Sequence, residues 1–125
     1  MKFKIAVVQF CINQFNPEDN LRRAEKFIKT ASFLNAQVII FPEDFITGPI
    51  FGKKEFADSN GKYVRSIQYF ASLYKIDIIP GSIIEKTAKG LFNTAYYVDS
   101  KGKIKGRYRK INLWIPERKY LTPGN

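Results

Sequence analysis

The sequence has 125 residues, of which 45% are hydrophobic and 26% charged, and it carries 21 Lys and Arg against 11 Asp and Glu. This size and composition exclude an intrinsically disordered chain and predict one domain, residues 1–125, with a hydrophobic core of its own. The net charge of +10 raises the question of nucleic-acid binding, because phosphate contacts need clustered Lys and Arg. A solvated basic surface is the alternative.

A single cysteine, Cys11, excludes an internal disulfide framework and is typical of a reducing compartment. No stretch approaches the ~20 apolar residues of a membrane-spanning helix, and the apolar run at the start is too short for a signal peptide. We therefore expect a soluble, cytoplasmic protein without a membrane partner.

The first part of the chain predicts a strand, a helix and a second strand. Apolar residues over 2–10 and 38–41 are typical of buried strands. Between them, Asn16 is a good N-cap and Pro17 a good first residue for a helix. Apolar residues then recur at spacings of three and four along an amphipathic helix: Leu21, Ala24, Ile28, Ala31 and Leu34. This order predicts a βαβ unit with parallel strands.

The middle of the chain begins with an irregular segment, 44–61, whose many apolar and aromatic residues favour the wall of a pocket over an idle surface loop. A second amphipathic helix is predicted over 62–74. A third strand is predicted over 76–84, where Pro80 and Gly81 interrupt it.

Two extended segments, 91–98 and 103–109, follow with only a turn between them and predict an antiparallel hairpin at the edge of the sheet. Basic residues fall on alternate positions of the second segment and so share one face: Lys101, Lys103, Lys105, Arg107 and Arg109. Because Ile104 and Tyr108 occupy the other face, we expect that face to be buried and the basic face to be solvated. No aromatic ladder accompanies the cations, so the pattern does not favour nucleic-acid binding.

Lys110 is in phase with the face that we expect to be buried, unless a bulge at Gly106 changes the phase. A buried ammonium group needs a carboxylate nearby, and Glu43, at the end of a predicted buried strand, has the same need for a partner. Taken alone, Lys110 is also consistent with an amine that reaches water, and Glu43 with a surface residue or a helix cap. Glu117 alone is most simply half of an exposed ion pair with Arg118.

Several short motifs occur in a fixed order: Phe41-Pro42-Glu43, Thr47-Gly48, Gly106-Arg107-Tyr108-Arg109-Lys110, Glu117-Arg118 and Tyr120-Leu121-Thr122-Pro123-Gly124. Together they resemble the carbon–nitrogen hydrolase superfamily, the nitrilase-like amidases, over nearly the whole chain. The resemblance implies an α/β fold, here the first half of an αββα sandwich. It also implies hydrolysis of non-peptide C–N bonds in amide, nitrile or carbamoyl substrates.

The resemblance further implies the site residues. Members of the superfamily use a Glu–Lys–Cys set, usually with a second glutamate. By motif, Glu43 matches the general base, Lys110 the lysine and Glu117 the second glutamate, and neither a metal nor an organic cofactor is implied. The nucleophilic cysteine of the family lies downstream of the lysine motif, beyond Asn125. Cys11 matches no nucleophile motif, and we expect it in the core or at the rim of the sheet.

The main hypothesis is therefore the N-terminal part of a thiol-dependent hydrolase for a small amide or nitrile, inactive as the isolated chain. Half a sandwich leaves sheet surface unburied, so we expect a homo-oligomer or a complementing C-terminal half as partner. Two alternatives remain, a non-catalytic interaction subunit of the same fold and, less favoured, a basic nucleic-acid-binding module.

Overall fold

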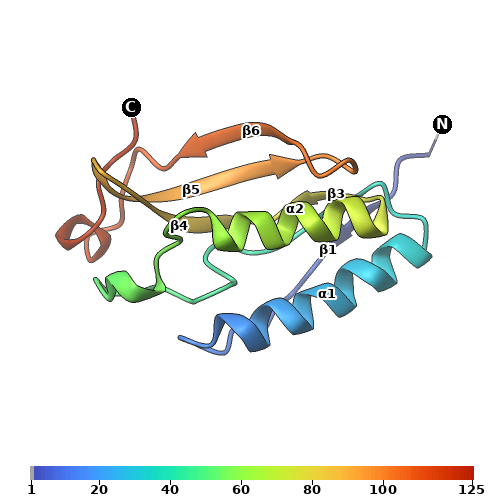
Figure 1. Ribbon diagram of the computed structural model, residues 1–125, viewed down its shortest axis with the longest axis horizontal. Helices are drawn as coiled ribbons and strands as arrows, with labels where there is room; N and C mark the ends of the chain where they lie inside the picture. The colour runs from blue at the N-terminus through green and yellow to red at the C-terminus, as the bar shows by residue number, and fades with distance from the viewer. Residues whose placement is uncertain (1) are drawn as a thin grey trace.

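The computed structural model describes residues 2–125 and shows a mixed α/β architecture, with two helices packed on one face of a sheet (Figure 1). The helices are α1 (Pro17–Phe33) and α2 (Lys62–Tyr74), and short 3-10 turns lie at Lys54–Phe56 and Glu117–Lys119. The strands within residues 2–125 are β1 (Ile5–Val7), β2 (Val38–Ile40), β3 (Asp77–Ile79), β4 (Ser82–Thr87), β5 (Gly90–Val98) and β6 (Ile104–Arg109).

Both helices begin where the sequence predicts. The side chain of Asn16 accepts a hydrogen bond of 3.2 Å from the backbone N–H of Asp19, and Pro17 is the first helical residue. The predicted apolar stripes of the two helices face the sheet and are largely buried, but Leu34 is 55% exposed because α1 ends one residue before it. Neither α1 nor α2 combines the length and the apolar composition needed to cross a membrane.

The parallel strands are shorter than the sequence pattern predicts. The segments 2–10 and 38–41 form only the three-residue strands β1 and β2, which pair in parallel with each other, and β2 pairs in parallel with β3. Pro42 has no N–H group with which to extend the ladder, so regular pairing stops just before it.

The predicted strand over 76–84 is divided into β3 and β4, and both pair antiparallel with β5. The bend between them contains Gly81, whose φ is 61°, a value that favours glycine. A Cβ atom at this position would lie 2.0 Å from the carbonyl oxygen of Pro42. The bend therefore brings the start of β4 against the loop that follows β2.

The β5–β6 hairpin is antiparallel, as predicted, but its register shifts between Tyr97 and Val98. This bulge places Ile104 opposite Val98, on the side of the sheet that carries the helices, while Tyr108 projects from the other side. The expectation that Ile104 and Tyr108 share a buried face is therefore wrong, and the two side chains are 42% and 58% exposed.

The basic residues of β6 are also not simply solvated. The guanidinium group of Arg109 donates two hydrogen bonds of 2.9 and 3.0 Å to Glu85 and lies 4.2 Å above the ring of Phe92. Arg107 makes a longer contact of 3.5 Å with the same carboxylate. Part of the positive charge of this strand is thus neutralised within the fold.

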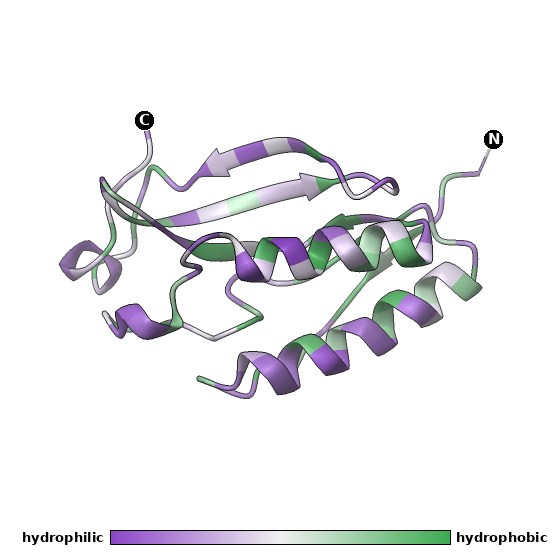
Figure 2. Ribbon diagram, in the orientation of Figure 1, coloured by the Kyte–Doolittle hydropathy of each residue, from purple (hydrophilic) through white to green (hydrophobic). Residues whose placement is uncertain are grey.

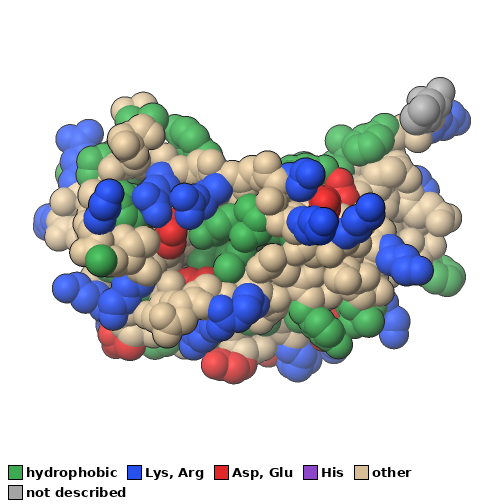
Figure 3. Space-filling view, turned by 45° about the horizontal axis from the view of Figure 1, so that its top comes forward, with side chains coloured by type: hydrophobic (Ala, Val, Ile, Leu, Met, Phe, Trp, Pro, Cys, Tyr) green, Lys and Arg blue, Asp and Glu red, His purple; other side chains and the backbone are tan. Residues whose placement is uncertain are grey.

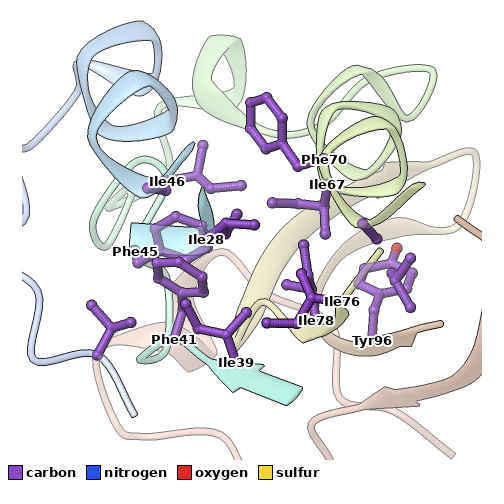
Figure 4. Close-up of a cluster of buried hydrophobic side chains, with 14 of the residues drawn as sticks. Ile28, Ile39, Phe41, Phe45, Ile46, Ile67, Phe70, Ile76, Ile78 and Tyr96 are labelled. Atoms are coloured by element: carbon purple, nitrogen blue, oxygen red, sulfur yellow. The ribbon is translucent and has the colours of Figure 1, made fainter. Parts of the chain in front are cut away.

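The core lies between the helices and the sheet (Figure 4). Ile28 and Ile67 of the two helices meet Ile39 and Ile78 of the central strands, and all four are almost fully buried. Phe45, from the segment 44–61, stacks on Phe41 with ring centroids 4.6 Å apart. This segment is therefore anchored in the core, which fixes the chain on both sides of Glu43. Figure 2 shows hydrophobic residues on the central strands and alternating hydrophobic and hydrophilic residues along both helices.

The opposite face of the sheet carries no helix within residues 2–125 (Figure 1). Ile5 and Val7 project from this open face and are 52% and 77% exposed. Tyr108 projects from the same face at the other end of the sheet.

Candidate active site

Glu43 lies at the carboxyl end of the parallel strands, two residues beyond the pairing of Phe41 with β3. Phe41 donates its backbone N–H to the carbonyl oxygen of Ile79 at 2.9 Å, and Pro42 packs against Gly81. These contacts fix the backbone just before Glu43, while the Glu43 side chain remains 55% exposed. A carboxylate in this place is available to a ligand.

Lys110 directly follows β6, and its backbone N–H donates to the carbonyl oxygen of Asn93 at 2.8 Å. Its ammonium nitrogen lies 2.9 Å from Glu43 Oε1 and 2.9 Å from Glu117 Oε2. The side chain is 29% exposed. The predicted meeting of Lys110 with Glu43 is therefore present, because the bulge in β6 lies before Lys110 and does not change its phase.

Glu117 is buried, with 7% of the residue exposed, and it lies in the 3-10 turn Glu117–Lys119. Its Oε2 atom also accepts a hydrogen bond of 2.8 Å from the backbone N–H of Trp114. The alternative of an exposed ion pair with Arg118 is wrong, because Arg118 donates to the carbonyl oxygen of Leu113 instead. The structure thus brings together all three side chains named from the sequence.

Asn93 is a fourth member of the cluster that sequence reasoning did not single out. This residue of β5 is 2% exposed and donates from Nδ2 to Glu43 Oε1 at 2.8 Å and to Glu117 Oε1 at 3.4 Å. The sequence signal for this contact is an asparagine in the middle of a largely apolar strand. A buried amide needs hydrogen-bond partners, so such a residue indicates a polar cluster.

The ion pair between Lys110 and Glu117 shifts the pKa values of both groups. Burial alone would lower the pKa of Lys110, but hydrogen bonds to Glu43 and Glu117 outweigh burial and raise that pKa above its ordinary value. Burial alone would raise the pKa of Glu117, but hydrogen bonds from Lys110 and Trp114 outweigh burial and lower it. Lys110 is therefore charged at neutral pH and Glu117 ionised.

Asp44 is a second carboxylate beside the cluster and was also not predicted. It is 7% exposed, has a φ of 53°, and accepts a hydrogen bond of 3.1 Å from the hydroxyl of Ser82. Burial, and then the neighbouring charge of Glu43, raise the pKa of Asp44 to about 7. This group therefore takes up a proton near neutral pH.

Oxygen atoms of Glu43, Asp44 and Glu117 lie within 4.8 Å of one another, an arrangement that acidic metal sites share. The ammonium group of Lys110 contacts two of these three carboxylates. The lysine thus supplies the positive charge that a metal ion would supply in such a cluster.

Two hollows flank the Glu43–Lys110 pair. One, of about 280 Å³, extends over the open face of the sheet to Ala95 and Tyr108, and the other, of about 330 Å³, reaches Pro49 in the predicted pocket wall. Cys11 is exposed and lines neither hollow, which agrees with the expected place at the rim.

Comparison with known proteins identifies the family. The family model described as carbon-nitrogen hydrolase matches residues 4–125. The chain belongs to the carbon–nitrogen hydrolase family. This result confirms the resemblance that the sequence motifs indicated.

Among curated relatives, the chain is 33% identical to a 2-oxoglutaramate amidase of Bacillus subtilis (strain 168), over 100% of the chain and 49% of the relative. It is 34% identical to a nitrilase of Pyrococcus abyssi, over 98% of the chain and 48% of that protein. It is 32% identical to the omega-amidase NIT2 of Homo sapiens, over 98% of the chain and 48% of that protein.

Solved structures give the same fold. A crystal structure of an amidase from Nesterenkonia sp. superposes with a TM-score of 0.89 at 21% identity, over 98% of this chain and 48% of that one. The predicted fold class is thereby confirmed as one portion of the nitrilase-superfamily amidase fold. The chain spans about half the length of the relatives that it matches.

Proposed function

We propose that this chain supplies the acid–base and electrostatic half of a hydrolase site for small amides or nitriles. The observation that supports it most is the ammonium group of Lys110, which lies 2.9 Å from oxygen atoms of both Glu43 and Glu117. Curated relatives with this family resemblance are named as amidases and nitrilases, and a mutant of the Nesterenkonia amidase has been solved with butyramide.

In this proposal Glu43 is the general base. A thiol becomes a strong nucleophile only as a thiolate, and a carboxylate that is half exposed beside a hollow can accept its proton. The same proton then goes to the departing ammonia or amine, and Glu43 next activates the water that releases the acyl group.

Lys110 is the electrostatic partner. Attack on the carbonyl or nitrile carbon places negative charge on the oxygen or nitrogen of the substrate, and a fixed cation stabilises that charge. Glu117, with its lowered pKa, keeps Lys110 charged and oriented. Asn93 bridges the two carboxylates by donating hydrogen bonds to both.

The thiol itself comes, in this proposal, from outside residues 1–125, either in a longer form of the chain or in a complementing C-terminal half. Cys11 is not placed to attack a substrate in the hollows beside Glu43. The alternative partner is a second copy of this chain, bound through the open face in a homo-oligomer. The single cysteine is consistent with action in the cytoplasm.

The test compares two proteins. The 125-residue chain alone is expected to release no ammonia from butyramide or other small amides. A fusion in which Asn125 is followed by the second half of the Bacillus subtilis relative is expected to release ammonia. The backbone N–H of Gly124 bonds the carbonyl oxygen of Lys110 at 2.9 Å, so the added segment would start beside the site.

Variants of the fusion assign the roles. Glu43→Gln is expected to lower kcat by about 10²–10⁴-fold and Lys110→Met by about 10²–10³-fold, the usual effects of losing a general base or an electrostatic donor. Cys11→Ala is the control and should leave kcat unchanged. Turnover by the chain alone, or fusion activity that survives Glu43→Gln, would contradict the proposal.

A further inference from the structure

A third hollow, of about 460 Å³, lies on the helix-bearing side of the sheet, away from Glu43 and Lys110. It is bounded by the start of α2, the end of β4 and the two strands of the hairpin. Figure 3 shows a hollow on this face with hydrophobic side chains inside it and charged side chains beside it. Its volume falls in the range, roughly 300–1,000 Å³, of sites for small organic ligands.

The two carboxylates of this hollow are already satisfied. Both oxygens of Asp58 accept hydrogen bonds of 3.1 Å from backbone N–H groups in the first turn of α2, at Tyr63 and Val64. Glu85 accepts two hydrogen bonds from Arg109 and a third, of 2.9 Å, from the hydroxyl of Thr94. Neither acid therefore needs a cation from a ligand.

Two other side chains of the hollow, those of Arg107 and Tyr96, have donor groups with bonding capacity left. The guanidinium group of Arg107 has only the 3.5 Å contact with Glu85, and its side chain is 53% exposed. The Tyr96 residue is 8% exposed, and its hydroxyl, which forms no hydrogen bond with another residue within 2–125, is therefore open to solvent in the hollow. Burial, and then the charge of Glu85, raise the pKa of Tyr96 to about 12, so the phenol keeps its proton.

The positions of these donors are complementary. Tyr96 and Arg107 are directly paired across the hairpin, so both project from the same face of the sheet. Val64 and Ile104 supply apolar walls on either side. A phenol hydroxyl that opens on the hollow without a protein partner, beside a guanidinium group with donors to spare and apolar walls, is a combination that an anionic organic ligand would complete.

We propose that this hollow binds a small organic carboxylate, whose oxygens accept hydrogen bonds from Arg107 and Tyr96 and whose apolar body covers Val64 and Ile104. The site is separate from the proposed hydrolase site. Its occupancy therefore does not depend on any hydrolase activity, and the 125-residue chain is sufficient to test it.

The experiment is a titration of the ¹⁵N-labelled chain with sodium benzoate, followed by amide chemical shifts. We expect saturable shifts centred on Val64, Tyr96, Ile104 and Arg107. Benzamide, which lacks the charge, and sodium sulfate, which lacks the apolar body, should each bind about tenfold or more weakly than benzoate.

Three variants assign the contacts. Arg107→Gln is expected to weaken benzoate binding by about tenfold or more, and Tyr96→Phe by about three- to tenfold. Lys103→Gln removes one charge from the same hairpin outside the hollow and should change affinity less than twofold. If Tyr96→Phe loses the dispersed amide spectrum of a folded chain, Arg107→Gln carries the test, because its side chain is half exposed.

No saturable shifts below about 10 mM benzoate would overturn the proposal. So would equal binding of sulfate and benzoate, shifts centred away from the hollow, or benzoate affinity that Arg107→Gln leaves unchanged.

Discussion

Lys110 lies at the centre of the cluster of charged side chains in the candidate site. Its ammonium group joins Glu43, which precedes it by 67 residues, to Glu117, which follows it by 7. With both glutamates ionised, the three groups carry one net negative charge, and an ionised Asp44 would add another. The uptake of a proton by Asp44 near neutral pH relieves that repulsion.

This arrangement predicts how stability depends on pH. The unfolded chain has an Asp pKa of about 4, whereas the pKa of Asp44 in the folded chain is about 7. Between these values the folded state holds the extra proton, so the contribution of Asp44 to stability falls as the pH rises from about 4 to 7 and then levels off.

Asp44→Asn removes the ionisation and should raise the free energy of unfolding by about 1–3 kcal/mol at pH 8, with little change at pH 4. Urea unfolding of the chain at the two pH values measures the difference. Glu55→Gln, a neutralising change at an exposed position, is the control and should have the same small effect at both. A stabilisation by Asp44→Asn that is equal at pH 4 and pH 8 would contradict the pKa assignment.

The residues of the site differ in how far the sequence could predict them. Glu43, Lys110 and Glu117 stand in motifs, so the sequence could name them as candidates, and their side chains do lie together. Asn93 and Asp44 gain their roles only from partners distant in the chain, namely Glu43, Glu117 and Ser82. No local sequence pattern predicts these contacts between residues distant in the chain.

Among the elements, the helices were predicted best because their signals are local. An N-cap, a proline in the first turn and a repeated apolar spacing define α1 without help from the rest of the fold. The length of a strand depends instead on the strand that it meets, which explains why β1 is only three residues long. The prediction that Ile104 is buried was wrong for a related reason. A bulge depends on how two strands pair and not on the sequence of one strand alone.

The bend between β3 and β4 is the element on which the position of Glu43 depends. Gly81→Ala should lower the free energy of unfolding by about 2 kcal/mol or more, because its methyl group would clash with the Pro42 carbonyl at a positive φ. Gly106→Ala is the matched control, since its Cβ atom would meet its nearest neighbour at 3.7 Å, and it should change stability by less than about 1 kcal/mol. Urea unfolding of both variants checks this. Equal losses would show that the close approach to Pro42 is not the cause.

At the scale of the whole molecule, one face of the sheet is covered by helices and the other is open. Exposed apolar side chains such as Ile5 and Val7 on a sheet without a second layer favour association. Relatives of twice this length match the chain over about half of their own sequence. That the chain is a single, incomplete domain remains a prediction.

The open face predicts that the isolated chain associates with itself. Sedimentation velocity should show species larger than a 14.5 kDa monomer as the concentration rises. Val7→Glu places a charge on the open face and should shift the distribution toward monomer. Phe33→Glu, on α1 at a residue that is 83% exposed, should not. A concentration-independent monomer of the unchanged chain would contradict this prediction.

The bulge in β6 separates the two ends of the hairpin. Pairing is shifted on the side of the turn, at Ile104, but regular from Gly106 to Arg109. A deletion of Lys105 would therefore remove the bulge and leave Ile104 opposite Val98, while Tyr108 and Lys110 kept their faces. A change of length on the turn side of the bulge is thus expected to alter the wall of the third hollow without displacing the lysine between the two glutamates.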